Sequence, residues 1–181
     1  SSFVHAGWFH LIGNMLFLLV FGDNVEDAFG PLPFIALYLV GGFVGDAWYV
    51  SSNAASMIPA VGASGCISAV AGAYGVLFFA NTIGVRLMLF VFPVHTFKVA
   101  APLVLLFWFG ADVFRTFAHH GVLPDGGGVN FVAHGAGFAF GMAVAAVALL
   151  VGVQRRYEGK ALGDAWLGYW VEPAPAPKRP V

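Results

Sequence analysis

The sequence predicts an all-α fold, a polytopic bundle of helices that cross a membrane. Of its 181 residues, 60% are hydrophobic and 9% are charged, whereas a soluble domain carries about 25% charged residues. The mean hydropathy is +0.85, and apolar runs approaching the roughly 20 residues that a membrane helix needs recur along the chain. The net charge of −1 argues against nucleic acid as a partner, because no basic patch is available to neutralise phosphates.

Five membrane spans are predicted. Prolines fall between these spans or just inside their ends, as expected of a residue that interrupts helices. The chain begins at Ser1, directly before the first span, so we expect a preceding portion with at least one further membrane helix. Residues 1–153 form the predicted membrane domain, and residues 154–181 form a Pro-rich tail that favours polyproline II or disorder. The predicted spans cover residues of about 8–29, 32–50, 64–79, 97–117 and 131–153.

Basic residues predict the orientation of these spans. The 22–31 turn, the 80–98 connection and the tail lie on one side of the membrane, and they hold every lysine and arginine except Arg115. Since basic residues concentrate on the cytoplasmic side, the tail is predicted to be cytoplasmic.

Four polar side chains fall near the opposite, non-cytoplasmic ends of three spans. His10 and Asn14 lie four residues apart in HLIGN and therefore share one face of the first helix. Ser64 begins the third span, and His134 lies in the first turns of the fifth. Polar groups inside a membrane are costly, so their gathering at one depth indicates a functional site.

Small residues at four-residue spacing offer a way to bring two of these spans together. The third span carries Gly65 and Ala69, and the fifth carries Gly137 and Gly141; such faces allow helix backbones to approach closely. If the two faces meet, Ser64 and His134 come within hydrogen-bond reach, as a base-activated serine requires. Taken singly, GASG, GxxxG and a lone histidine are more typical of packing. Their combination in this order favours catalysis.

At these residues the chain resembles the rhomboid family of intramembrane serine proteases. HLIGN at 10–14, GASG at 62–65 and AHGAGFAFG at 133–141 are similar to that family's three motifs. The resemblance implies a bundle of at least six spans, the first of them preceding this chain, and a water-accessible cavity open to the non-cytoplasmic side. It implies Ser64 as nucleophile, His134 as base, and oxyanion donors from His10, Asn14 and the backbone at Ser64. The implied partners are transmembrane protein substrates and the lipid bilayer.

Several polar residues are not explained by these motifs. In some rhomboids an aromatic residue four positions after the serine packs on the catalytic histidine, but here that position is Ser68. The role of His5 is open. Asp46 and Asp112 are interpreted as structural, since the family works with a Ser–His dyad. No cofactor or metal is implied, because the histidines lack HExxH or similar spacing.

Two other interpretations remain. One is a catalytically inactive rhomboid-like protein that binds membrane helices, although such relatives usually lack the serine or the histidine. The other is a transporter or channel fragment, which predicts intramembrane charge pairs or inverted repeats; the sequence shows no internal repeat. The short loops and compact layout favour a bacterial inner membrane.

Overall fold

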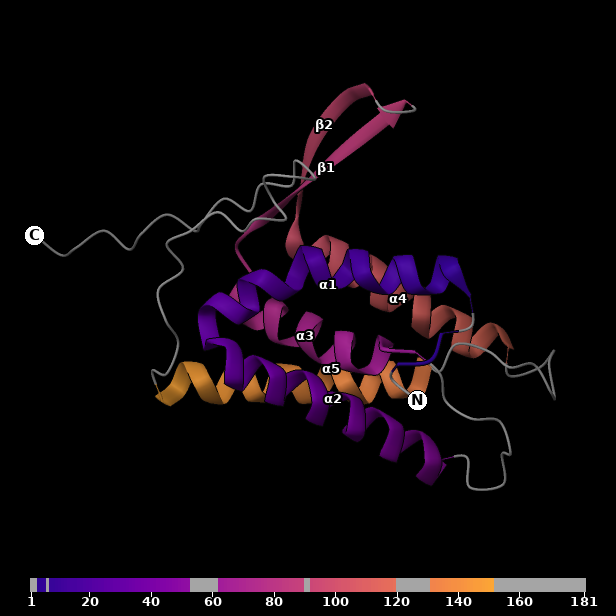
Figure 1. The fold of residues 1–181 in the computed structure, drawn as a ribbon, viewed down its shortest axis with the longest axis vertical. Helices are drawn as coiled ribbons and strands as arrows, with labels where there is room; N and C mark the ends of the chain where they lie inside the picture. The colour runs from indigo at the N-terminus through magenta and orange to yellow at the C-terminus, as the bar shows by residue number, and fades with distance from the viewer. Residues whose placement is uncertain (1–2, 6, 53–61, 90–91, 120–130, 152–181) are drawn as a thin grey trace, which may run out of the picture.

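The computed structural model describes residues 3–5, 7–52, 62–89, 92–119 and 131–151 (Figure 1). This part of the chain forms five helices and one β-hairpin. The predicted tail, 154–181, lies outside the described residues. In chain order the elements are α1 (Trp8–Phe29), α2 (Pro31–Ser52), α3 (Ser64–Leu77), β1 (Thr82–Leu89), β2 (Phe92–Ala100), α4 (Ala101–His119) and α5 (Phe131–Val151).

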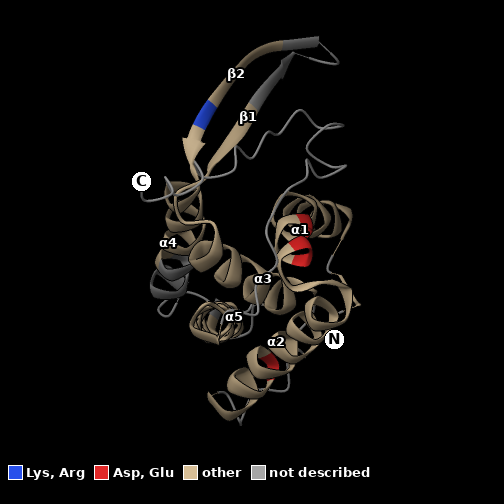
Figure 2. Ribbon diagram, turned by 90° about the vertical axis from the view of Figure 1, so that its left-hand side faces the viewer, with Lys and Arg blue, Asp and Glu red and all other residues tan. Residues whose placement is uncertain are grey.

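Helix α3 is the centre of the bundle, in contact with α1, α2, α4 and α5 (Figure 2). Its residues from Gly65 to Tyr74 are all buried. Most of them are glycine, alanine or serine, and small side chains let neighbouring backbones come close in a membrane bundle. The composition of α3 thus explains its central place.

The outer surface of the bundle is strongly apolar. Phe9 is 93% exposed and Leu150 86% exposed, and many other large apolar side chains point outward. Among the described residues, α1, α2 and Val132–Val151 of α5 are long and apolar enough to cross a membrane. Exposed apolar surface on this scale fits hydrocarbon as the surrounding solvent. The chain is an integral membrane protein.

One of the five predicted spans is shorter than a full crossing. Helix α3 has 14 residues, whereas α4 has 19. Helix α4 begins four residues after the predicted start at 97, because that stretch belongs to β2.

The hairpin between α3 and α4 was not predicted. Strands β1 and β2 pair antiparallel, from Thr82 opposite Ala100 to Leu89 opposite Phe92. The apolar run before Pro102 is compatible with a strand or a membrane helix by hydrophobicity alone. Cross-strand pairing makes it a strand, and α4 then starts with a proline in its first turn, where proline is tolerated.

Candidate active site

Ser64 is the first residue of α3. The first helical hydrogen bond runs from the Ile67 N–H to the Ala63 carbonyl, 2.9 Å, so the N–H groups of the preceding residues have no acceptor within the helix. No side chain caps this N-terminus within the described part of the chain. These N–H groups, together with the helix dipole, favour a negative charge at this point.

Close backbone contact joins α3 to α5 beside Ser64. A Cβ added to Gly137 would lie 2.5 Å from the carbonyl oxygen of Gly65, and one added to Gly141 would collide with the carbonyl oxygen of Ala69. Both helices run in the same direction past these contacts (Figure 1). Ser64 directly precedes Gly65, and His134 lies about one turn before Gly137, so the N-terminal ends that carry them lie side by side.

His134 is almost completely buried, with 3% of its surface exposed. The indole ring of Trp108, from α4, stacks on its imidazole with ring centroids 5.9 Å apart and an interplanar angle of 22°. The stacked ring restricts the directions in which the imidazole can turn.

The position four residues after the serine, aromatic in some rhomboids, is tightly packed here. Ser68 is fully buried, and its Cβ would lie 3.4 Å from a Cβ added to Gly137. Its hydroxyl donates a 2.7 Å hydrogen bond to the carbonyl oxygen of Ser64 and so braces the first turn of α3. The aromatic partner of His134 comes from a different helix.

Further rings support Trp108 from behind. It contacts Phe17 of α1 with ring centroids 4.9 Å apart, and Phe17 contacts Phe21 at the same distance. Phe21 packs edge-on against the buried ring of Tyr74 in α3, again at 4.9 Å. A continuous row of aromatic rings therefore connects the centre of the bundle to the imidazole of His134.

His10 and Asn14, from α1, lie against the GASG loop that precedes Ser64. A Cβ added to Gly62 would lie 2.7 Å from Cε1 of His10 and 3.6 Å from Nδ2 of Asn14. Gly62 has φ of +107°, a conformation that favours glycine. The amide nitrogen of Asn14 is buried and has no hydrogen-bond partner among the described residues. The GASG loop thus runs directly past both predicted oxyanion donors.

Of the other polar residues singled out in the sequence, His5 lies beside this cluster. The ring of His5 packs edge-on against that of His10, with centroids 5.3 Å apart. Asp46 is half-buried in α2, while the side chain of Asp112 lies outside the described ones. Within the described residues, no three histidine, cysteine, aspartate or glutamate side chains gather as a metal site.

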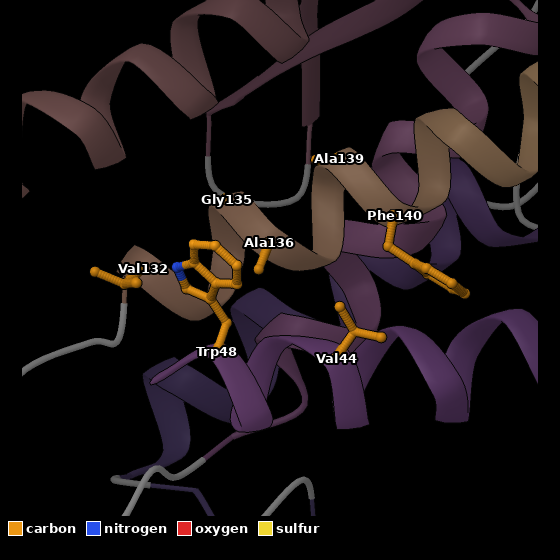
Figure 3. A pocket seen from close by; sticks show the side chains of 7 residues that line it. All are labelled: Val44, Trp48, Val132, Gly135, Ala136, Ala139 and Phe140. Atoms are coloured by element: carbon orange, nitrogen blue, oxygen red, sulfur yellow. The ribbon is translucent and has the colours of Figure 1, made fainter. Parts of the chain in front are cut away.

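A separate apolar groove of about 540 Å³ lies between α2 and α5. Val44 and Trp48 of α2 face α5 across it (Figure 3). None of its lining residues is among the predicted site residues, and its apolar walls suit the hydrocarbon around the bundle. The lining consists of Val44, Trp48, Val132, Gly135, Ala136, Ala139 and Phe140.

Sequence reasoning missed Trp108. Its neighbours in LLFWFGADVF are almost all apolar, so no periodic pattern shows which of the three consecutive aromatic residues faces the site. Only the packing of α4 against α1 and α5 selects it.

Comparisons with known proteins bear out the resemblance to the rhomboid family. The family model described as "Rhomboid domain" matches residues 1–151. RHOMBOID-like protein 1 of Arabidopsis thaliana is 31% identical over 147 residues, which is 81% of this chain and 33% of that protein. Rhomboid-related protein 2 of Mus musculus is 32% identical over 142 residues, 78% of this chain and 44% of that protein.

A shorter match is found to Rhomboid protein 1, mitochondrial, of Saccharomyces cerevisiae, 34% identical over 98 residues, 52% of this chain and 27% of that protein. The chain therefore corresponds to less than half the length of these relatives. No solved structure matches. With a rhomboid domain covering most of its length and rhomboid relatives at this level of identity, the chain belongs to the rhomboid family.

Proposed function

We propose that this chain carries the active site of an intramembrane serine endopeptidase, which hydrolyses peptide bonds in or near the transmembrane segments of other membrane proteins. The observation that carries the proposal is the backbone contact of Gly65 with Gly137. That contact supports a dyad, because it joins the helix end bearing Ser64 to the turn bearing His134. Membership of a family whose members are generally serine proteases adds to this support.

In the proposed reaction Ser64 Oγ attacks the scissile carbonyl carbon while the His134 imidazole accepts the hydroxyl proton. The carbon–nitrogen bond then breaks, and the imidazolium returns the proton to the leaving amine. Water, deprotonated by the same imidazole, attacks the acyl-enzyme; collapse of the second intermediate releases the acid and restores the serine. The indole of Trp108 keeps the imidazole in one orientation throughout.

The tetrahedral intermediates need hydrogen-bond donors aimed at the oxyanion. The uncapped N–H groups at the start of α3 are one source, and the buried amide of Asn14 is a second. His10, beside the same loop, is the third. An amide nitrogen that is buried beside the serine loop without a partner is in keeping with a donor reserved for a charge that forms only during the reaction.

Depth in the membrane supports an intramembrane site. His10 lies 13 residues before the acidic Asp23 in α1, and Ser64 lies 13 residues before the end of α3 at Leu77. Each separation is a rise of about 20 Å. A hydrocarbon core is about 30 Å thick. With both helices along the membrane normal, the site lies about 10 Å below the non-cytoplasmic surface of that core.

The basic residues support a site that opens on the non-cytoplasmic side, with the tail in the cytoplasm. A bacterial inner membrane suits the short loops of this chain. A mitochondrial or chloroplast membrane is the competing location, supported by the printed names of several relatives.

The test is labelling of the full-length protein in detergent micelles by a fluorophosphonate probe that reacts with activated serines. We expect labelling of the wild type and none of Ser64→Ala or His134→Ala. Ser51→Ala is the matched control, because that serine is exposed in α2 and bonds only the local carbonyl of Trp48; it should label fully. A folded wild type that does not label would favour the inactive, helix-binding alternative.

A further inference from the structure

The β1–β2 hairpin stands apart from the helices that build the site. It projects above the bundle in the view of Figure 1, across the direction of the helices, and among the described elements it contacts only α4, at its base. A lone two-stranded hairpin is marginally stable in water and needs a further surface to pack on. Ile83, at the base of the hairpin, is buried in the core of the bundle. Farther out, Val94 is 64% exposed and Phe97 40% exposed, so the described protein does not cover this outer part.

The strand register gives the hairpin two chemically different faces. Partners across an antiparallel pair point to the same side, and the side alternates along each strand. Val85 opposite Phe97 and Ile83 opposite Val99 belong to one face. Ile83 is the member of this face that is buried in the core of the bundle, and His95, stacked on Phe97, marks the polar end of this face toward the tip. On the other face Gly84 lies opposite Lys98, and Arg86 lies opposite Thr96. Near the bundle one side is therefore apolar, and the other side carries the register positions of both basic residues of the hairpin.

The position of the hairpin in the membrane limits which kinds of surface can cover its exposed side chains. It connects the end of α3 to the start of α4 and so lies at the membrane surface where these helices begin and end. An open sheet edge cannot lie in the hydrocarbon, because its N–H and C=O groups would have no partners there. The headgroup layer offers hydrogen-bond partners to these edges and apolar depth beneath them.

We propose that this hairpin is an interfacial anchor, which lies along the membrane with its apolar face toward the acyl chains. The opposite face, which carries Lys98 and the register position of Arg86, then meets anionic lipid phosphates. The partner is a lipid surface that contains anionic headgroups. This inference stands independently of the proposed protease activity.

Spin labels at two neighbouring positions test the anchor. Full-length protein is reconstituted into phosphatidylcholine vesicles with and without phosphatidylglycerol, and labelled at Phe97→Cys or, for the control face, at Thr96→Cys. Both side chains are exposed, so folding should tolerate the changes. The wild type measures labelling background, because its one cysteine, Cys66, is buried.

Collision rates with oxygen, which enters the bilayer, and with a water-soluble nickel chelate then report depth. We expect a higher oxygen-to-nickel ratio at Phe97 than at Thr96, and a larger difference with phosphatidylglycerol. An Arg86→Gln/Lys98→Gln variant should lose the dependence on phosphatidylglycerol. Equal nickel access at both positions would overturn the proposal, since the hairpin would then stand in water. Protection of both positions from both reagents would also overturn it, by indicating a protein cover. The outcome is the same in Ser64→Ala, which separates this test from that of catalysis.

Discussion

Replacing Gly141 with alanine should separate α5 from α3 and disturb the dyad at its base. The new Cβ would collide with the carbonyl oxygen of Ala69, a backbone atom in the most buried helix of the bundle. Neither backbone can turn aside, so the helices must move apart by more than about 1 Å to reach ordinary contact. Overpacking of this kind costs about 1–3 kcal/mol of stability.

The effect on catalysis should be larger than the effect on folding suggests. A displacement of about 1 Å between reacting groups costs on the order of 10²-fold in rate, and Gly141 lies two turns from His134 on the same helix. We therefore expect Gly141→Ala to lower kcat about 10²-fold in cleavage of a reconstituted transmembrane substrate, and to lower the thermal unfolding temperature.

The control is Gly135→Ala in the same helix, where an added Cβ would meet nothing within 4 Å. It should keep or slightly raise the stability of the wild type, because alanine has a higher helix propensity than glycine and its Cβ causes no collision here. Full activity and unchanged unfolding of Gly141→Ala would refute the close α3–α5 packing on which the dyad depends. Equal damage from both alanines would show that the loss does not come from this contact.

Three further changes probe the rest of the site. Asn14→Ala should lower kcat by about 10²–10³ with little change in KM, because removing one oxyanion donor costs ~2.7–4 kcal/mol; an unchanged kcat would remove Asn14 from the oxyanion hole. Trp108→Ala should lower kcat up to about tenfold, from the ~0.5–1.5 kcal/mol of a ring pair, while Trp108→Phe largely restores it. Phe109→Ala removes a ring contact between α4 and α5 that lies away from the dyad, so equal losses there would mean that Trp108 acts only through packing. Gly62→Ala should abolish labelling by the fluorophosphonate probe, since its φ of +107° and its contact with the neighbouring imidazole both exclude a side chain; normal labelling would contradict that geometry.

The sequence was sufficient where the physical cause is local. The predicted spans 8–29 and 32–50 became α1 and α2 within two residues at each end, and the start of α3 at Ser64 was predicted to the residue. Long apolar runs between prolines have few alternatives in a membrane, because the backbone must satisfy its own hydrogen bonds there.

Prediction failed where the decisive contact is distant along the chain. The stretch 97–100 has the composition of a membrane helix, and only its pairing with β1 makes it a strand. Trp108 was missed for the same reason. The sequence of α4 does not show that this helix must supply a ring to His134. That requirement arises in other helices, where Ser68 packs tightly against Gly137. Local patterns define the helices, but the identity of the residue that fills a gap between helices depends on all the helices around that gap.

Contacts between helices that are distant in the sequence also explain why an apolar bundle tolerates a polar cluster. Every polar group brought into the membrane must find partners or pay a large desolvation penalty. The start of α3 already has N–H groups without acceptors, since every helix leaves such groups at its N-terminus. Putting the serine there, beside histidine and asparagine, gathers these unsatisfied donors at one site. Glycine and alanine contacts with α5 then set the distance between the two helices through backbone atoms, which cannot change rotamer. The polar site is thus held by apolar packing, and its geometry should prove most sensitive to added methyl groups between α3 and α5.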